Sequence, residues 1–443
     1  MAAGRARGKR PPATLHVAEP SAAYARRPRI VADATVLAAA MFVGASCTSS
    51  SPEPIRIGAV YPLSGTQGPG GVDEFEGVQL AVQLVNAGGG IGGRPVELVP
   101  VDTPSADAAP GAIARLHDDG VRLVLGSYGS TISAPAAEAS ARRDMLFWET
   151  GAVGEMTGGG AGELVFRVAP SGAILGRNAI AFVADEYAPV LDVDPSELRY
   201  AVTLVDDVYG RAVAQGALDE LAARGYDVVG TFGYDPRAVN MRAFVRDLAE
   251  SRPDVVFVSA YLHDAIVMRR EMVRQGLDVL VGIGTSSSYC MPRFGSTLGE
   301  DAVGLFASDK PASNALNVEG LTPDGRALLQ RATAAYAERF GGPMSAAALA
   351  GFSGAWALAH EVLSGAADPT PAAVASAANV VDLPEGSLPN GSGLRFGEPG
   401  TVTAGANVLA SSVVWQWQAP GEYAVVWPPR YATSPIEPLD PLP

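Results

Sequence analysis

The sequence contains few of the residues that build metal and redox sites, with only 2 cysteines among 443 residues. Its 4 histidines form no zinc-ligand pattern and no His-Glu-x-x-His motif, so no metal and no cofactor are predicted. Cys47 and Cys290 cannot build a disulfide scaffold. Aromatic residues make up 7% of the chain and hydrophobic residues 48%, which is the composition of a globular protein. The length of 443 residues predicts two or three domains.

A catalytic set is also missing. Gly351–Ala355 resembles the Gly-x-Ser-x-Gly turn of serine hydrolases, but Ala355 replaces its last glycine and the surrounding Ala-rich run predicts a helix. The glycine runs 88–90 and 158–160 lack the lysine or the spacing of a phosphate-binding loop. The sequence therefore predicts a protein that is not an enzyme, and a hydrolase using Ser353 is the disfavoured alternative.

Positive charge is scarce outside the N-terminus. The chain carries 32 Lys and Arg against 47 Asp and Glu, for a net charge of −15. A surface this acidic repels phosphate backbones and anionic lipid head groups, so no nucleic-acid partner is expected. Residues 1–46 alone carry +5, which sets them apart from the remaining chain at −20.

The first 46 residues are typical of an export signal. A basic cluster at Arg26–Arg29 precedes the apolar stretch Ile30–Ser46, which ends in small residues directly before Cys47. This order indicates a bacterial lipoprotein in which Cys47 is acylated and residues 47–54 form a tether. The expected location is extracytoplasmic, anchored to the cell membrane. The alternative is an unmodified cysteine buried in a stray apolar segment.

From Ile55 onwards, apolar runs rich in β-branched residues alternate with helices of about ten residues. This alternation predicts βαβ units and parallel sheets, and its repetition after Tyr200 predicts two such sheets in tandem. The expected strands are 55–63, 96–101, 121–126, 145–149, 200–205, 228–234, 255–261, 279–283 and the last strands within 413–428. Ligands of open parallel sheets bind beyond the carboxyl ends of the strands, so those ends hold the candidate residues.

The loop after strand 121–126 contains Tyr128, Ser130 and Thr131 ahead of a helix predicted from Ser133, where Pro135 suits a first turn. Hydroxyls and free amides at a helix start form an anion site, so Ser130 and Thr131 are candidates to hold a carboxylate or another polar edge of a ligand. The alternative is that these hydroxyls only cap the helix.

Further candidates follow the next strands. Glu149 is a carboxylate near the mouth of the predicted sheet, followed by the small residues of Thr150–Ala152, where Gly151 and Ala152 let a ligand approach the backbone. In the second half, Asp207 and Tyr209 follow one strand and Tyr261 follows another. An aromatic face with a polar tip suits a cleft wall, although tyrosine at a strand end is just as often packing.

Four blocks of the sequence match a known family. They are Ile55–Gly65 (IRIGAVYPLSG), Glu76-Gly77, Asn86–Leu98 (NAGGGIGGRPVEL) and Asp207–Gly210 (DVYG). The chain resembles the branched-chain amino-acid (Leu/Ile/Val) binding family of type I periplasmic substrate-binding proteins of ABC transporters. The likeness extends over nearly all of 55–428.

The resemblance implies an α/β fold of two lobes, each a mostly parallel sheet flanked by helices, joined by a three-crossing hinge. The first lobe is expected to comprise 54–169 and 305–392, and the second 170–304 and 393–428, with 429–443 as a C-terminal tail. The crossings are expected near Ala169-Pro170, Leu305-Phe306 and Gly393-Leu394. A ligand would be clamped between the lobes, and the closed form presented to an ABC permease.

In the amino-acid binders of this family, a Ser at the helix start and a Thr after the next strand hold the ligand carboxylate, and a Glu in the second lobe holds the ammonium. Ser130 falls on the first of these positions. The Thr position is Ala152, which leaves Thr150 and backbone amides. The Glu position falls at 284–286, where Thr285 is a polar residue and no acid is present.

These departures bear on the identity of the ligand. A site without a carboxylate should reject an ammonium group, because an unpaired buried ammonium costs several kcal/mol. Glu149, Asp206 or Asp207 could replace the missing acid; otherwise the ligand is not a plain α-amino acid. Gly70 and Ala347 stand where the family has aromatic residues, which would leave room for a bulkier ligand.

We expect a solute-binding lipoprotein that delivers a small polar or amphipathic metabolite, an amino acid or related compound, to the permease and ATPase of an ABC importer. The alternative is a ligand-sensing receptor of the same fold that acts through a partner protein. The family's first-lobe disulfide is absent, since Cys47 and Cys290 are the only cysteines and Cys47 is the expected site of lipidation.

Overall fold

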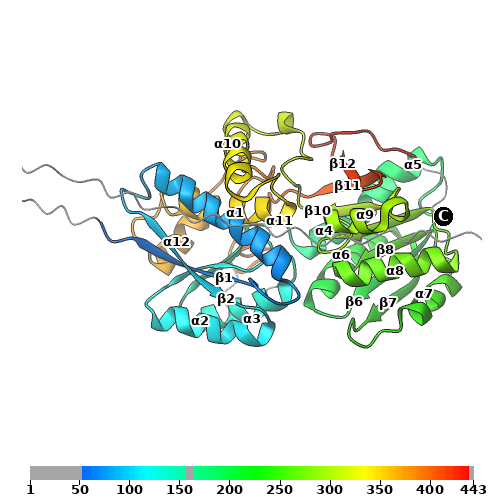
Figure 1. Cartoon of the computed structure of the whole chain (residues 1–443), viewed down its shortest axis with the longest axis horizontal. Helices are drawn as coiled ribbons and strands as arrows, with labels where there is room; N and C mark the ends of the chain where they lie inside the picture. The colour runs from blue at the N-terminus through cyan, green and yellow to red at the C-terminus, as the bar shows by residue number, and fades with distance from the viewer. Residues whose placement is uncertain (1–51, 156–162, 439–443) are drawn as a thin grey trace, which may run out of the picture. The chain divides into compact units, whose positions relative to one another are not determined.

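The computed structural model describes residues 52–155 and 163–438. The expected export signal, Cys47, most of the tether, the glycine run 158–160 and the end of the tail therefore lie outside the described residues. The described chain forms two separate β-sheets with helices between their strands (Figure 1). This is the predicted two-lobed α/β architecture.

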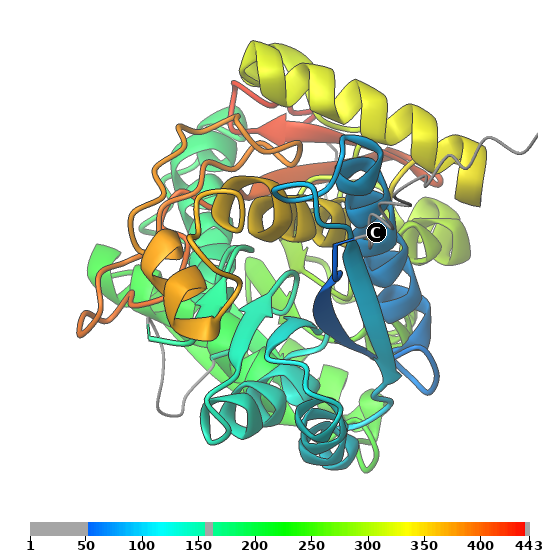
Figure 2. The same cartoon turned by 90° about the vertical axis from the view of Figure 1, so that its left-hand side faces the viewer.

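The first sheet has five strands in the order β2-β1-β3-β4-β5, and all of its pairings are parallel. Helices α2 and α3 cover one face and α1 and α11 the other (Figure 2). The bounds are β1 Ile55–Tyr61, α1 Gly68–Ala87, β2 Val96–Asp102, α2 Ala109–Asp118, β3 Leu123–Gly126, α3 Ser130–Ala141, β4 Leu146–Glu149, β5 Val165–Arg167, α10 Pro323–Phe340, α11 Ala346–Trp356 and α12 Pro371–Ala378.

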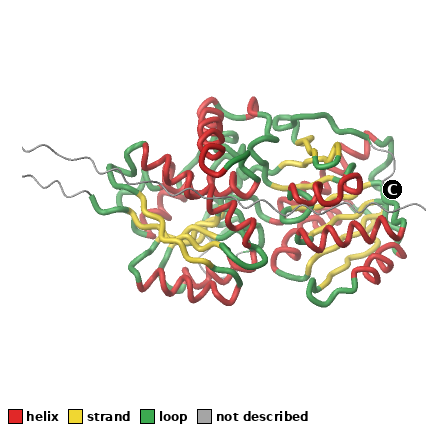
Figure 3. The backbone as a smooth tube through the Cα atoms, in the orientation of Figure 1, coloured by secondary structure: helices red, strands yellow, loops and turns green. Residues whose placement is uncertain are grey.

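The second sheet has seven strands in the order β12-β11-β10-β9-β8-β6-β7. Strands β10, β9, β8, β6 and β7 pair in parallel, whereas β11 and β12 form the antiparallel edge next to β10. The strands of the two sheets form separate groups in Figure 3. The bounds are α4 Gly172–Phe182, α5 Ala188–Val190, β6 Arg199–Val205, α6 Val208–Arg224, β7 Asp227–Tyr234, α7 Met241–Glu250, β8 Val255–Ser259, α8 Leu262–Gln275, β9 Val281–Thr285, α9 Pro292–Leu298, β10 Phe306–Asp309, β11 Val413–Ala419 and β12 Glu422–Trp427.

Short 3₁₀ or π-helical turns complete the described elements. They are Ala106–Ala108, Val183–Tyr187, Gly299–Ala302, Val318–Gly320 and Ala357–Val362. Two of them, 183–187 and 357–362, are π-helical continuations of α4 and α11.

Two glycines bring α1 and α11 into close contact on the first sheet. A Cβ at Gly77 would overlap the carbonyl oxygen of Ala348, and a Cβ at Gly351 would overlap that of Glu74. The helices can therefore approach backbone to backbone, as only glycine allows. This packing carries Glu74 of α1 into the protein interior, where it is fully buried.

Strand pairing places the second chain crossing later than the expected Leu305-Phe306. Phe306–Asp309 forms β10, which pairs with β9 on one side and with β11 on the other, both in the second sheet. The chain therefore leaves this sheet after Asp309. This strand was not predicted because it is only four residues long, FASD, and contains no β-branched residue.

The third crossing also differs from the expected Gly393-Leu394. Leu394 bridges to Leu383, and Phe396 packs edge-on against Trp148 of the first sheet with ring centroids 5.2 Å apart. Residues 393–409 thus contact the first sheet, where Ala406 bridges to Arg167 of β5. The long polar loop in this region gave no strand signal that could fix the boundary.

Helix α3 begins at Ser130, three residues before the predicted start. Pro135 therefore lies inside the helix instead of in its first turn. The earlier start matters for the site, because it brings the first turn of α3 directly to the end of β3.

Candidate ligand-binding site between the two sheets

The loop 127–129 joins β3 to α3 and leaves the helix start open. The N-cap residue is Gly129, which has no side chain to cap the helix. The Ser130 hydroxyl instead accepts a hydrogen bond from the backbone amide of Gly154 at 2.9 Å, so capping is not its role. Thr131 accepts a hydrogen bond from the Gln67 side chain at 3.1 Å. The first turn of α3 thus presents polar groups at the carboxyl end of β3.

Glu149 lies behind this loop and not in front of it. Its fully buried carboxylate accepts hydrogen bonds from the amides of Ser127, Gly151 and Ala152 at 2.7–3.0 Å, and from the hydroxyl of Ser133. The pKa of Glu149 is raised, because the effect of burial exceeds the opposing effect of these hydrogen bonds. Glu149 therefore fixes the loops after β3 and β4, and its carboxylate has little capacity left for a ligand.

Thr150 faces a second buried acid. Its hydroxyl donates to Glu74 at 2.7 Å and lies 2.7 Å from the hydroxyl of Tyr61. Burial raises the pKa of Glu74 to about 8, and the charge of Glu149 adds to the shift, while the Thr150 hydrogen bond and the charge of Lys310 oppose it. A Cβ at Gly151 would overlap this Glu74 carboxylate, which explains why a glycine occupies position 151.

Tyrosines form the wall on the second sheet. Tyr209 and Tyr261 pack with ring centroids 5.3 Å apart. The Tyr261 hydroxyl donates to Asp207 at 2.7 Å, and Asp207 also caps α6 by accepting from the amide of Gly210 at 2.9 Å. The Tyr209 hydroxyl donates to the carbonyl of Ser286 and lies 3.2 Å from the Thr285 hydroxyl. Asp207 and Thr285 therefore orient the two rings.

A small cavity of about 10 Å³ separates these two walls. It is lined by Gln67, Tyr128, Gly129, Ser130, Gly151 and Val153 from the first sheet and by Tyr209, Tyr261, Ser286 and Ser287 from the second. The structure thus brings together Tyr128, Ser130, Gly151, Tyr209 and Tyr261 among the predicted residues. The other predicted residues, Thr131, Glu149, Thr150, Ala152, Asp207 and Thr285, do not line it.

Two residues of the cavity have strained backbones. Tyr128 and Ser287 both adopt positive φ, at 71° and 66°, which is uncommon for residues other than glycine. Such strain concentrates at functional sites. The ring of Tyr128 also lies where a side chain at Gly70 would be, so the room expected from the glycine at position 70 is taken by this tyrosine.

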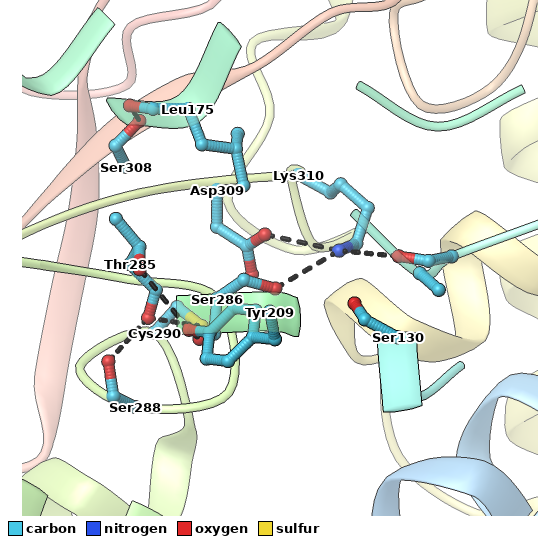
Figure 4. Close-up of polar contacts among 12 residues, drawn as sticks. Ser130, Leu175, Tyr209, Thr285, Ser286, Ser288, Cys290, Ser308, Asp309 and Lys310 are labelled. Carbon is cyan, nitrogen blue, oxygen red and sulfur yellow. Dashed lines mark hydrogen bonds and ion pairs between the residues drawn. The ribbon is translucent and has the colours of Figure 1, made fainter. Parts of the chain in front are cut away.

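A second cavity of about 90 Å³ adjoins the first, sharing Tyr128, Ser286 and Ser287 with it. Its wall includes Asp309 and Lys310, which the sequence analysis missed (Figure 4). Asp309 is the last residue of β10 and Lys310 follows it directly. Both would have been candidates if this strand had been predicted, because ligands bind beyond the carboxyl ends of parallel strands. A second signal was available, because lysine occurs only at Lys9 and Lys310 in the whole sequence.

No helix within 52–155 or 163–438 is long and apolar enough to cross a membrane.

Comparison with known proteins identifies relatives over most of the chain. The sequence profile of the periplasmic binding protein family matches residues 54–410. Leu/Ile/Val-binding protein homolog 8 of Brucella abortus is 29% identical over 385 residues, which cover 86% of this chain and 92% of the relative. Leu/Ile/Val-binding protein homolog 7 of Brucella melitensis is 28% identical over 401 residues, covering 90% and 96%.

Solved structures share the fold. A leucine-binding protein of Thermotoga maritima superimposes with a TM-score of 0.70 at 17% identity, over 84% of this chain and 97% of that one. A branched-chain amino-acid transporter substrate-binding protein of Streptococcus pneumoniae in complex with isoleucine gives 0.66 at 17% identity, over 85% and 100%. The chain therefore belongs to the periplasmic binding protein family, whose members bind solutes outside the cytoplasm and are not enzymes.

Proposed function

We propose that the protein is an extracytoplasmic receptor that captures a small polar or amphipathic metabolite between its lobes and delivers it to the permease and ATPase of an ABC importer. One observation carries this proposal. Hydroxyls and amides at the carboxyl ends of one parallel sheet face tyrosine rings and hydroxyls at the carboxyl ends of a second sheet, across a shared cavity. The names of the relatives support binding of an amino acid or a related compound.

We further propose that the first lobe comprises about 54–169 and 310–411, and the second about 170–309 and 412–438. Strand pairing supports these limits. A cavity of about 10 Å³ is far smaller than typical ligand pockets of roughly 300–1,000 Å³, so a ligand needs the lobes to separate before it can enter. Opening and closing about the three crossings would be a hinge movement.

The anchor remains a proposal from the sequence. Acylation of Cys47 would tether the binding lobes to the membrane through residues 47–54. Expression of the full chain in a bacterium, followed by separation of membranes, should find the protein in the membrane fraction. Replacing Cys47 by Ala should release it, and retention of this variant in the membranes would contradict lipid anchoring.

The binding role can be tested with the purified protein against a panel of amino acids and related acids, using thermal shift and then calorimetry. The Ser130→Ala variant should bind the best ligand more weakly by about 1–3 kcal/mol, because one buried polar group loses its partner. Ser376→Ala is the matched control, since Ser376 lies exposed on α12 and bonds only within that helix. Absence of any binding across the panel would refute the receptor role, and an unchanged affinity in Ser130→Ala would remove Ser130 from the site.

A further inference from the structure

Lys310 places a buried ammonium group beside the ligand cavity. The residue is 5% exposed, and its Nζ lies 3.2 Å from a carboxylate oxygen of Asp309, 3.2 Å from the Gly151 carbonyl and 3.2 Å from the Ser286 hydroxyl. The contacts with Gly151 and Ser286 are hydrogen bonds from the ammonium, and the contact with Asp309 is an ion pair. Figure 4 shows the ammonium between Asp309 and Ser286 on one side and the first-sheet residues on the other.

Lys310 remains charged in this setting. Burial lowers the pKa of its ammonium, but the neighbouring carboxylates of Asp309 and Glu74 outweigh burial and raise it above the ordinary value of 10.5. The charge is therefore a fixed part of the site at neutral pH. Asp309 is itself almost fully buried, so the two residues form a buried ion pair. Loss of either partner would leave an uncompensated buried charge.

The three acceptors form the set that a ligand ammonium would require: one carboxylate, one carbonyl and one hydroxyl. Gly151 and Ser286 line the 10 Å³ cavity, while Ser286 and Asp309 line the adjoining 90 Å³ cavity. The position suited to an ammonium at this junction is therefore filled by the protein's own side chain. An amino acid binding here would bring a second cation next to the first.

The other acids near the cavity have partners or lie elsewhere. Glu149 accepts several hydrogen bonds from its own loops, and Asp207 holds Tyr261 and the start of α6. Asp206 pairs with Arg211 on the exposed surface. The fully buried Glu74 lies behind Gly151 and accepts from the Thr150 hydroxyl at 2.7 Å. Asp73 lines the 90 Å³ cavity and accepts from the Ser345 hydroxyl at 2.9 Å, so it is the acid of the cavity wall to be tested.

We propose that Lys310 determines the specificity of this site, and that the ligand is an organic carboxylate whose α-carbon carries no ammonium group. This inference rests on the proposed binding function. The carboxylate would meet the Ser130 hydroxyl and the open first turn of α3, and Lys310 would exclude the corresponding amino acid by occupying its ammonium site and repelling its charge.

The test measures affinities for matched pairs by calorimetry. The pairs are 4-methyl-2-oxopentanoate with L-leucine, phenylpyruvate with L-phenylalanine and 2-oxoglutarate with L-glutamate, and the amide 4-methylpentanamide serves as an uncharged probe beside 4-methylpentanoate. The wild-type protein should bind the acid of at least one pair at least about 100-fold more tightly than its amino acid, because a buried ammonium without acceptors is costly. The affinity for 4-methylpentanoate should likewise exceed the affinity for 4-methylpentanamide.

Three variants keep the result interpretable. Lys310→Met frees the Asp309 carboxylate, the Gly151 carbonyl and the Ser286 hydroxyl, so it should gain amino-acid affinity by about tenfold or more. The double variant Lys310→Met with Asp309→Asn removes the whole ion pair, avoids a lone buried charge and should not gain amino-acid binding. Asp73→Asn should leave the preference unchanged. Circular dichroism melting checks that each variant folds.

The outcomes separate this inference from the proposed function. If no probe binds any variant, the receptor role itself fails. If the wild-type protein binds the amino acid of a pair as tightly as its partner acid, or the amide as tightly as the carboxylate, only the role of Lys310 fails. If Lys310→Met and the double variant gain amino-acid affinity equally, Asp309 is not the acceptor, which also overturns the inference.

Discussion

The two walls of the cavity occupy equivalent places at the carboxyl ends of parallel strands, yet they are built differently. The first-sheet wall consists of backbone loops whose amides are held from behind by the buried acid Glu149. The second-sheet wall consists of the side chains of Tyr209 and Tyr261, oriented by Asp207 and Thr285. We therefore expect that substitutions of the buried acids behind the first wall mainly change folding stability, whereas substitutions of the second-wall tyrosines change affinity at little cost in stability.

Removal of the buried acid behind the first wall should destabilise the protein most. Glu149→Ala leaves buried amides of Ser127, Gly151 and Ala152 without an acceptor, so the free energy of unfolding should fall by about 3–5 kcal/mol. Urea denaturation followed by circular dichroism measures this change.

Glu138→Ala is the matched control for that experiment. Glu138 pairs with Arg142 on the exposed face of the same helix α3, and a surface pair contributes at most about 1 kcal/mol. A loss in Glu149→Ala no larger than the loss in this control would show that the first wall does not depend on its buried acid.

The second acid behind the first wall should give the protein a pH-dependent stability. The folded-state pKa of Glu74 is raised from 4.5 to about 8, so the folded protein holds a proton that the unfolded chain releases as the pH rises above 4.5. The stabilisation of the folded state by protonated Glu74 is therefore fully present below pH 4.5. It is lost as the pH rises towards 8, at up to about 1.4 kcal/mol per pH unit.

Glu74→Gln keeps the shape of the side chain and removes its titration. Relative to the wild-type protein, its free energy of unfolding should rise by about 3 kcal/mol between pH 5 and pH 8. Denaturation curves at the two pH values measure this difference, and the exposed Glu97→Gln serves as the control. Parallel pH profiles of Glu74→Gln and the wild-type protein would be inconsistent with a neutral Glu74.

The same contrast explains what the sequence could and could not predict. The apolar runs located the strands that precede Ser130, Tyr209 and Tyr261, because strand ends follow from hydrophobic pattern alone. The direction in which a carboxylate points does not follow from that pattern, so Glu149 and Asp207 were predicted to bind a ligand although they hold backbone amides and a tyrosine. Lys310 was missed because it follows β10, a strand of four residues that pairs with neighbours distant in sequence.

The smallest expected effect lies in the second wall. Tyr261→Phe removes the hydroxyl that donates to Asp207 at 2.7 Å but keeps the ring packed on Tyr209, so unfolding free energy should fall by no more than about 1 kcal/mol. The affinity for the best ligand should fall by about 1 kcal/mol, because a ring without this bond is less firmly oriented. Calorimetry and urea denaturation of the same preparation give both numbers. If Tyr261→Phe lost as much stability as Glu149→Ala and kept its affinity, the second wall would contribute to folding and not to binding. This result would contradict the proposed difference between the two walls.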